Sequence, residues 1–381
     1  MKVAIVHYWL VNMRGGEKVL ELLCDIYPDA DIFTLVYDPA AISEKIKRHK
    51  ITASFIQKLP FGVKKYQQYI PLHPFAIEQF DLSMYDLVIS SESGVAKGVI
   101  LPPDVCHICY CHSPVRYIWN MYHEYRRELG PVKKVIWAVV SNFLRQWDYI
   151  NAQRVDYFIA NSRNVQQRIR KYFNRESTVI YPPVDVGKFH NSPAEDFFLF
   201  VGQLNPYKKA DIAVEAFNRS GRKLVIIGDG PQRSQLEKKA APNIKFLGKQ
   251  PDDVLIDYYS RCKGFIFPGE EDFGITPLEA MASGKPVIAY GRGGALETVV
   301  EGKTGMFFYE QHSDILSDAV VKAEKIQWNP DSIINHAYKF NVDIIKKKLS
   351  DYVQATYSDF IKKTYNSSSD SKNIFSTYDA T

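Results

Sequence analysis

The stretch GFIFPGEEDFGITPLEAMASGKPVIA, Gly264 to Ala289, contains a short apolar run, a glycine-bearing turn, a helix-like segment and a second apolar run. Thr276 suits the N-cap and Pro277 the first helical position, and Glu279 then falls where the acidic partner of a capping box belongs. Two apolar runs joined by a helix predict parallel strands. We therefore expect a strand–helix–strand unit whose turn, with Gly274, follows the end of its first strand.

The same alternation runs along the whole chain. Between the apolar runs lie segments with apolar residues at three- and four-residue spacing, such as DIAVEAFNRS (211–220) and DVLIDYYSRC (253–262). This alternation predicts parallel sheets covered by helices on both faces. The expected strands are KVAIVHYWL, DIFTLV, DLVISS, HICYCH, DYFIANS and TVIYPPV in the first half, and FFLFVGQL, KLVIIGDG, IKFLG, GFIFPGE, KPVIAYG and TGMFF in the second.

Length and a break in the pattern predict two domains. The chain has 381 residues, more than one hydrophobic core usually serves, and PPVDVGKFHNSPAED (182–196) is proline-rich, polar and without periodicity. We expect an α/β protein with two doubly wound, Rossmann-like domains and a ligand-binding cleft between them. The expected ranges are 1–185 and 186–348, a helix over 349–365 that packs back towards the first domain, and a flexible polar tail over 366–381.

Composition argues against several classes of protein. Hydrophobic residues make up 46% of the chain and charged residues 24%, which is typical of a globular protein. No apolar run reaches the roughly 18 residues of a membrane span, and the first residues lack a signal-peptide pattern, so we expect a cytoplasmic protein. A net charge of +5 is mild for a nucleic-acid binder, and we expect no nucleic-acid partner.

The cysteines allow two interpretations. Three of the five stand in CHICYCH (106–112), which also offers His107 and His112 as metal ligands. The run is short and apolar, and nothing in it turns the backbone around an ion, so a buried strand with free cysteines is favoured over a zinc site. The odd number of cysteines also argues against a disulfide framework.

The turn after Phe267 has the chemistry of a ligand site. Gly274 lets a ligand approach the backbone, and the amides from Gly274 to Thr276 lie at a helix N-terminus, where a phosphate binds well. Glu271 and Glu279 flank this turn, and carboxylates accept hydrogen bonds from sugar hydroxyls at about 1.5–3 kcal/mol each. An anion site between two hydroxyl acceptors describes a nucleotide sugar, although a helix-capping role for Glu279 stays open.

The segment EEDFGITPLEAMASGKPVIA resembles the motif of retaining GT-B glycosyltransferases of family 4 in which seven residues separate two acids. The resemblance extends over RGGEKVLELL, YCHSPVRYIWN, NSRNVQQRI, VIYPPVDVGKF and VGQLNPYKKADIAVEAF, and is greatest to bacterial O-antigen mannosyltransferases. It implies transfer of α-mannose from GDP-mannose to a polyprenyl-diphosphate-linked glycan, with retained configuration, no cofactor and no metal. A UDP-sugar donor is the alternative. Other polysaccharide-assembly enzymes are implied as partners.

The resemblance also implies a donor site. Glu271 would contact the transferred sugar, Glu279 the ribose, and Lys208 the diphosphate as it leaves. The implied donor-binding residues are Gly202, Gln203, Lys208, Lys209, Phe273, Gly274, Ile275, Thr276 and Glu279. Taken without the resemblance, Lys208 has the plain alternative of a solvated lysine.

One donor position departs from the family pattern. Many relatives have arginine where this chain has Gln203, so the leaving phosphates would meet one fixed cation fewer. Arg292 or Lys209 is the candidate for compensation.

The acceptor side is implied by residues of the first domain. Gly15, Gly16 and Arg116 would border the acceptor, and His112 matches the histidine beside the sugar, so that His112, Lys208 and Glu271 are the candidate catalytic residues. The alternatives are that the two glycines only shape a turn and that His112 is a hydrogen-bonded core residue.

Two basic, aromatic stretches predict where an acceptor would be met. They are KIKRHKITASFIQKLPFGVKKYQQYIPLHPF (45–75) and VRYIWNMYHEYRRELGPVKKVIWAVVSNFLRQW (115–147). Such surfaces bind anionic lipid at about 1 kcal/mol per well-placed cation, so we expect peripheral attachment to the cytoplasmic face of the membrane. Solvated helices with aromatic core faces are the alternative.

Rival functions leave more of the sequence unexplained. A nicotinamide-dependent oxidoreductase needs a glycine fingerprint after its first strand, and HYWLVNMRGGEK lacks that spacing. A noncatalytic membrane adaptor gives no reason for the turn with Glu271 and Glu279, and no motif for the cofactor lysine of a glycan phosphorylase is found. The DAD at Asp29 to Asp31, which resembles a metal-binding pair, is interpreted as a surface loop.

Overall fold

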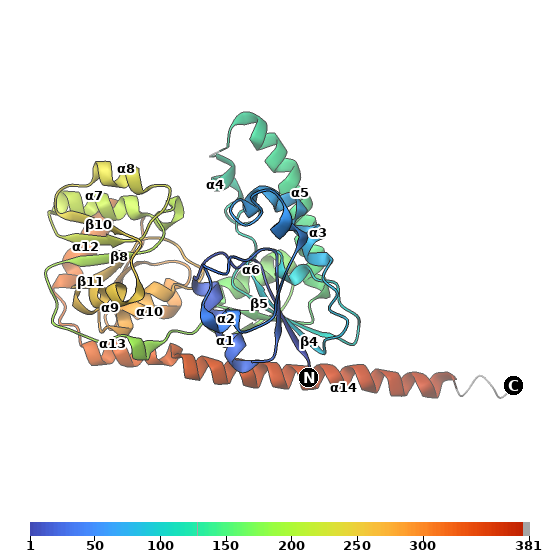
Figure 1. Ribbon diagram of the computed structural model, residues 1–381. Helices are drawn as coiled ribbons and strands as arrows, with labels where there is room; N and C mark the ends of the chain where they lie inside the picture. Colours follow the sequence, from blue (N-terminus) through green and yellow to red (C-terminus); the bar gives the residue numbers. More distant parts are fainter. Residues whose placement is uncertain (128, 376–381) are drawn as a thin grey trace. The chain divides into compact units, whose positions relative to one another are not determined.

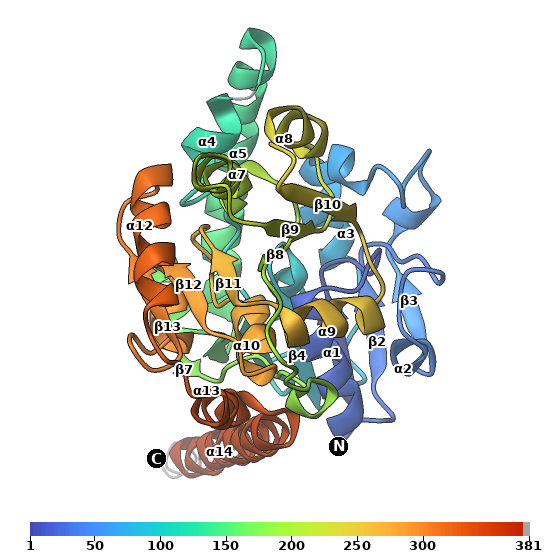
Figure 2. The ribbon, with the colours of Figure 1, turned by 90° about the vertical axis from the view of Figure 1, so that its left-hand side faces the viewer.

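The computed structural model describes residues 1–127 and 129–375, with side chains up to Thr364 (Figures 1 and 2). The chain forms two compact units. The first contains residues 1–161, 165–180 and those from Lys346 onward, and the second contains residues 162–164 and 181–345. Each unit is built on its own parallel sheet, so the predicted two-domain α/β fold is confirmed.

The first unit has a seven-stranded sheet in the order β3-β2-β1-β4-β5-β6-β7. Every strand pair is parallel, and β1 and β4 are aligned so that His7 lies opposite Ser91. The central strands are buried along their whole length, as the apolar runs predict for a sheet covered on both faces. The strands are β1 (Val3–His7), β2 (Asp31–Thr34), β3 (Ile51–Ala53), β4 (Leu87–Glu92), β5 (Cys106–Cys111), β6 (Tyr157–Ala160) and β7 (Thr178–Val179).

Helices cover this sheet because they place apolar side chains against it. Ile77 packs with Val6 and Val88, whereas Val165 and Ile169 pack with Cys109 and others in a separate cluster. The helices are α1 (Gly15–Ile26), α2 (Glu44–Lys47), α3 (His73–Glu78), α4 (Tyr122–Arg127), α5 (Pro131–Arg154) and α6 (Arg163–Phe173), with the 3₁₀ helices η1 (Phe55–Lys58), η2 (Tyr66–Leu72) and η3 (Ala96–Gly98).

The C-terminal helix is longer than predicted. α14 runs over Val342–Phe375, whereas the sequence predicted a helix over 349–365 and a flexible tail from 366. The polar residues 366–375 continue the helix, because extending an existing helix costs far less than starting one. Residues 376–381 of the predicted tail lie outside the described residues. Within the first unit, the Tyr157 hydroxyl donates a 2.9 Å hydrogen bond to Asp359 on α14.

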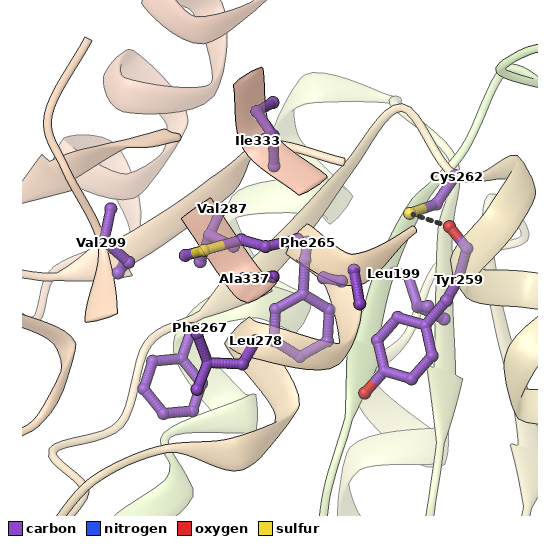
Figure 3. Packing of buried hydrophobic residues seen from close by; sticks show 14 of the residues in the cluster. Leu199, Tyr259, Cys262, Phe265, Phe267, Leu278, Val287, Val299, Ile333 and Ala337 are labelled. Atoms are coloured by element: carbon purple, nitrogen blue, oxygen red, sulfur yellow. Dashed lines mark hydrogen bonds between the residues drawn. The ribbon is translucent and has the colours of Figure 1, made fainter. Parts of the chain in front are cut away.

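The second unit has a six-stranded parallel sheet in the order β10-β9-β8-β11-β12-β13. Neighbouring residues of one strand face opposite clusters: Phe265 and Phe267 belong to one apolar core, and Ile266 belongs to the other. Figure 3 shows the first of these cores, with Leu278 beside Phe265. The strands are β8 (Phe198–Val201), β9 (Leu224–Ile227), β10 (Ile244–Gly248), β11 (Gly264–Phe267), β12 (Val287–Tyr290) and β13 (Gly305–Phe308).

Helices supply the outer side of both cores. The helices are α7 (Ala210–Ser220), α8 (Arg233–Lys239), α9 (Asp252–Arg261), α10 (Ile275–Ala282), α11 (Ala295–Thr298), α12 (Ser313–Glu324) and α13 (Pro330–Ala337), with the 3₁₀ helices η4 (Val186–Lys188), η5 (Pro206–Lys208) and η6 (Tyr338–Phe340). Leu278 of α10 and Ile333 of α13 join one core, and Phe217 of α7 and Leu316 of α12 join the other.

The observed division lies close to the predicted one. The first unit gives way to the second between Ile180 and Tyr181, near the predicted boundary at 185, and returns at Lys346, near the predicted 348. All twelve predicted strands form. The structure adds β3, which the sequence analysis missed because it has only three half-buried residues at the edge of the sheet.

Candidate functional site

The two acids and the lysine of the predicted donor site belong to the second unit. β8 and β11 are parallel neighbours, so the segments that follow them leave the same edge of the sheet. Lys208 follows β8 and Glu271 follows β11, and Lys208 Nζ forms an ion pair with Glu271 Oε1. Their side chains are only 20% and 16% exposed. Two residues that the resemblance assigned to one ligand are thus in contact.

A glycine allows the two segments to approach each other this closely. A Cβ on Gly269 would lie 2.9 Å from the Lys208 Cα and 3.0 Å from its carbonyl oxygen, so no other residue fits there without movement. Lys209, directly after η5, has a φ of 57°, in the left-handed region that costs most residues about 1 kcal/mol or more. The lysine segment is therefore held in one path against β11.

A second loop fixes the backbone of Glu271. Gly294, which follows the neighbouring strand β12, donates a 2.9 Å hydrogen bond to the Glu271 carbonyl oxygen. Gly293 has a φ of 63°, and a Cβ there would lie 2.4 Å from the same oxygen. The sequence analysis singled out only Arg292 from this loop. The glycine-rich run GRGG (291–294), at the end of a predicted strand, is the signal that could have pointed to the other loop residues.

The helix beside Glu271 begins earlier than predicted. α10 starts at Ile275 with Gly274 as its N-cap, at a φ of 92°, so Thr276 is the second helical residue and Pro277 the third. The predicted capping box with Thr276 and Glu279 is wrong, because Gly274 turns the backbone into the helix and no side chain caps it. The amides of Ile275 and Thr276 lie in the first turn, where the helix dipole favours an anion.

Glu279 points to a buried tyrosine. The Tyr259 hydroxyl donates a 2.9 Å hydrogen bond to Glu279 Oε2. Burial, and then the charge of Glu279, raise the pKa of Tyr259 well above its usual range, so the hydroxyl keeps its proton and stays a donor. Figure 3 shows Tyr259 at the end of the core near Phe265, where Cys262 Sγ donates to the Tyr259 carbonyl oxygen. The core therefore orients the carboxylate that was assigned to the ribose.

The other implied donor residues lie in the same unit, each with its own neighbours. Gly202 and Gln203 follow β8, and Gln203 Oε1 accepts a 3.2 Å hydrogen bond from Asn205. Phe273 is buried and stacks on Tyr181 at 5.3 Å between ring centroids, within the second unit. Arg292 is exposed, with its guanidinium 5.9 Å from the Tyr290 ring centroid. Compensation for Gln203 by Arg292 or Lys209 stays a prediction.

The implied acceptor residues belong to the first unit. α1 begins at Gly15, and a Cβ on Gly16 would lie 2.3 Å from the Tyr8 hydroxyl oxygen. The Tyr8 ring lies 6.2 Å from the His112 ring, edge to face. His112 follows β5 and is half-buried, and Arg116 lies on the same loop. Gly16 and His112 therefore border the same tyrosine.

His112 is neutral at ordinary pH. Burial, and then His7, lower its pKa to about 3. Its Nε2 lies 2.8 Å from Ser91 Oγ. The His112 ring is thus hydrogen-bonded, as the plain alternative predicts, and is also a partly exposed group beside Tyr8. A structural role and a role in binding are compatible.

The candidate metal-binding motifs have structural partners instead. CHICYCH forms β5, with its three cysteines buried and free, as the strand interpretation predicted. Asp31 of the DAD sequence begins β2 and accepts a hydrogen bond from the Tyr85 hydroxyl. Across residues 1–127 and 129–364, whose side chains are described, no group of three His, Cys, Asp or Glu side chains is placed to hold a metal ion. The same residues include no helix that is long and apolar enough to cross a membrane.

Comparison with known families agrees with this geometry. The model of the family described as "Glycosyl transferases group 1" matches residues 186–340, and that of "Glycosyltransferase Family 4" matches residues 14–188. Together they cover residues 14–340, which contain every strand of both sheets except β1. The chain belongs to the family 4-like glycosyltransferases with the GT-B fold.

Individual relatives are similar over parts of their length. O-antigen chain mannosyltransferase C from Escherichia coli is 28% identical over 56% of this chain and 60% of its own. The GDP-mannose-dependent alpha-mannosyltransferase of Mycolicibacterium smegmatis is 39% identical over 28% of each chain. The chain spans 60% of the length of the Escherichia coli enzyme and 49% of the length of an uncharacterized glycosyltransferase from Methanocaldococcus jannaschii.

Solved structures share the fold. Sucrose-phosphate synthase from Thermosynechococcus elongatus matches with a TM-score of 0.72 at 16% identity, over 94% of this chain and 100% of the other. HepE from Anabaena, solved with UDP, matches with a TM-score of 0.67 at 17% identity, over 93% and 100%. At these identities the match establishes the two-domain GT-B architecture alone.

Proposed function

We propose that this chain is a retaining glycosyltransferase that moves a hexose from a nucleoside diphosphate sugar to an acceptor hydroxyl. The observation that carries the proposal is the contact between Lys208 and Glu271 at the edge of the second sheet. The cation and the first amides of α10 suit a diphosphate, and the two carboxylates suit the hydroxyls of the sugars on either side of it. The family relationship supports the reaction class.

Donor binding would change the partner of Lys208. A diphosphate carries more negative charge than one carboxylate, so the ammonium group turns to the phosphates. Glu271 Oε1 then accepts hydrogen bonds from the sugar hydroxyls. Glu279, held by Tyr259, accepts from the ribose. Each acid thus keeps a hydrogen-bond donor in both states, and neither is left as a buried, unpaired charge.

The chemistry follows from where charge develops. As the bond between the anomeric carbon and the phosphate breaks, negative charge grows on the diphosphate and positive charge on the sugar. Lys208 and the amides of Ile275 and Thr276 stabilise the first, and Glu271 stabilises the second. The acceptor hydroxyl attacks from the face that the phosphate leaves, so the configuration is retained and no protein nucleophile is needed.

We propose mannose, supplied as GDP-mannose, as the transferred sugar. The mannosyltransferases of Escherichia coli and Mycolicibacterium smegmatis support this choice, and the UDP complex of Anabaena HepE keeps a UDP-sugar as the alternative. A thermal-shift panel of GDP, GDP-mannose, UDP, UDP-glucose and NAD tests it, because a ligand at 100 times its Kd adds about 2.7 kcal/mol. Stabilisation by GDP and GDP-mannose is expected. A response to UDP alone would discard mannose, and a response to NAD alone would overturn the reaction class.

We also propose that transfer needs no metal ion, because Lys208 and the helix amides already supply positive charge at the diphosphate. Full activity in EDTA is the expected result. Loss of activity in EDTA that magnesium or manganese restores would contradict this.

The proposed acceptor is a polyprenyl-diphosphate-linked glycan, met at the cytoplasmic face of the membrane. The support is α5, which lies beside α4 and extends beyond the sheet of its unit (Figure 1). One face of α5 packs inward through Ser141, Leu144 and Asp148. The opposite face is apolar yet 48–72% exposed, and its residues are Val132, Val135, Ile136, Val139, Phe143 and Ile150. We call these six residues the α5 stripe.

The α5 stripe has the spacing and the flanking charge of a membrane-surface helix. Its members are one, three, four or seven residues apart, spacings that place them on one side of the helix. Lys133 and Lys134 stand at the stripe's N-terminal end, and Arg126 and Arg127 precede them on α4. Apolar side chains beside cations fit a bilayer that carries anionic lipids. We propose this stripe as the surface on which the enzyme meets its lipid-linked acceptor.

Vesicle sedimentation tests the membrane surface. The wild type should sediment with phosphatidylglycerol-containing vesicles and not with pure phosphatidylcholine. The double change Val135→Ser, Val139→Ser should abolish sedimentation, whereas Ile100→Ser, at an exposed apolar residue outside α5, should not. Binding that survives the double change would overturn the assignment. A wild type that dimerises through the α5 stripe and binds no vesicles would show that the stripe is a dimer interface and not a membrane surface.

A further inference from the structure

A buried chain of polar groups leads from the start of α1 to His112. Ser91 Oγ lies 3.0 Å from His7 Nδ1 and 2.8 Å from His112 Nε2. Beyond His7, Glu17 Oε1 lies 3.7 Å from His7 Nε2. His7, Ser91 and Glu17 are at most 1% exposed, and within the described residues His7 Nε2 has no hydrogen-bond partner. Three buried polar side chains are thus lined up behind one partly exposed imidazole.

The fold itself brings these groups together. β1 and β4 pair with His7 directly opposite Ser91, and the His112 backbone N–H donates to the Glu92 carbonyl at the end of β4. Glu17 lies in the first turn of α1, where its Oε2 accepts a 2.9 Å hydrogen bond from the Arg14 N–H. The carboxylate is therefore fixed at one oxygen and presents the other to His7.

Hydrogen-bond direction passes along this chain. A carboxylate favours an N–H over a lone pair on the facing nitrogen, so His7 carries its proton on Nε2 and leaves Nδ1 as an acceptor. Ser91 has one proton and donates it to His7 Nδ1, so its oxygen accepts from His112 Nε2–H. The Nδ1 atom of His112 is then unprotonated and accepts hydrogen bonds.

We infer that Glu17 and Ser91 are positioning residues that fix the tautomer of His112, so that Nδ1 accepts a hydrogen bond from a hydroxyl of the substrate. The part about the substrate rests on the proposed function, whereas the part about the tautomer does not. His112 is the group that touches the substrate, and Glu17 acts on it only through His7 and Ser91.

Glu17→Gln is the sharpest variant because it keeps the shape of the side chain. The glutamine oxygen still accepts from the Arg14 N–H, which turns the amide NH₂ towards His7 Nε2. This reverses every hydrogen bond in the chain and moves the His112 proton to Nδ1. Ser91→Ala is the second variant, and it removes the hydroxyl that connects His7 to His112. Ser90→Ala is the matched control, because Ser90 is equally buried on β4 but bonds His107 Nε2 at 2.9 Å.

Tautomers are measured by nitrogen-15 NMR of histidine-labelled protein, with His112→Asn to identify the signal among nine histidines. The wild type should show the Nε2–H tautomer at His112, Glu17→Gln the Nδ1–H tautomer, and Ser91→Ala a mixture, while Ser90→Ala should match the wild type. An Nδ1–H tautomer in the wild type, or an unchanged one in Glu17→Gln, would overturn the inference.

Turnover of the nucleotide sugar separates this inference from the proposed function. Glu17→Gln should lower kcat by about tenfold, the factor that one neutral hydrogen bond commonly contributes, with little change in KM. A reversed tautomer with unchanged kcat would overturn the link to the substrate. A wild type that turns over no nucleotide sugar would end the proposed function, and the NMR spectra would still decide the hydrogen-bond chain.

Discussion

Lys208 Nζ forms an ion pair with Glu271 Oε1, and the two side chains reach each other from the segments that follow the neighbouring strands β8 and β11. Both are mostly buried, and the contact satisfies each charge before any ligand arrives. A lysine that is already ordered loses less conformational entropy when it turns to a diphosphate. In the proposed function the pair would therefore prepare the donor site in advance.

Removal of the lysine should damage the reaction more than binding. We expect Lys208→Met to lower kcat by about 100- to 1000-fold, the range for loss of one preorganised group that meets developing charge. Initial rates of sugar transfer at saturating donor measure it. Lys245→Met, at an exposed lysine of β10, is the control and should stay near wild type. Equal losses in the two variants would point to a general effect of charge on the unit.

Glu279 should recognise the ribose through its hydroxyls. We expect Glu279→Gln to weaken GDP binding by at least about tenfold, since a hydrogen bond to a charged acceptor contributes about 1.5–3 kcal/mol. Binding of a dideoxy nucleotide that lacks both ribose hydroxyls should be weak in the wild type and unchanged by the substitution. Titration calorimetry of GDP and the dideoxy nucleotide, each with the wild type and with Glu279→Gln, measures the four affinities. A substitution that weakens both nucleotides equally would place Glu279 elsewhere in the site.

Substitution of Gly293 by alanine should cost more stability than its positive φ angle alone would cause. Gly293 and Gly302 have similar positive φ angles, 63° and 72°, so alanine costs about 1 kcal/mol at each. At Gly293 the added methyl would also meet the Glu271 carbonyl oxygen, whereas at Gly302 nothing lies within 4 Å. Gly293→Ala should therefore lower the free energy of unfolding by more than Gly302→Ala and also reduce turnover. Urea unfolding and initial rates compare them, and equal losses would contradict the role given to this loop.

Acid should destabilise the first unit through its buried histidines. Burial lowers the pKa of His107 to about 3 and that of His73 to about 4, whereas an unfolded histidine titrates near 6.5. Between these values the unfolded chain binds more protons, so the free energy of unfolding rises with pH. Each histidine contributes at most about 1.4 kcal/mol per pH unit below pH 6.5. Urea unfolding at pH 6.5 and 5.0 measures this slope.

His107→Gln removes one of these groups. The free energy of unfolding should then rise less steeply with pH, by the contribution of one titrating histidine. Its stability at pH 6.5 will also fall, because Ser90 loses its partner, so the slope and not the absolute value is the readout. A slope equal to that of the wild type would show that His107 does not titrate on unfolding.

Much of the fold could be predicted from the sequence because its signals are local. Short apolar runs alternating with helical spacing predicted twelve strands, both parallel sheets and the break between the units. The start of α10 could not be predicted in this way. Thr276 and Pro277 predict a helix that begins at Pro277, but Gly274 is the N-cap, with a positive φ, and the helix begins at Ile275. β3, with three half-buried residues, carries almost no pattern at all.

The candidate site was predictable in its residues but not in its contacts. Glu271, Glu279 and Lys208 came from a motif, which names positions without saying what holds them. Tyr259 and the loop of Gly293 and Gly294 are distant in the sequence or lack a chemical signature, and only the sheet order brings them to the acids. The polar groups from Glu17 to His112 come from α1, β1, β4 and the loop after β5, and each meets the next through one side-chain contact, which no spacing reveals.

Sugar release from GDP-mannose by the wild type and by Glu271→Gln, at saturating donor, tests the central claim most directly. The account predicts turnover by the wild type and a loss of at least about 100-fold in the variant, because Glu271 meets charge that develops only as the glycosidic bond to phosphate breaks. A Glu271→Gln protein that keeps the full rate would contradict the role of this site. A folded wild type that turns over neither GDP-mannose nor any other nucleotide sugar would contradict the function itself.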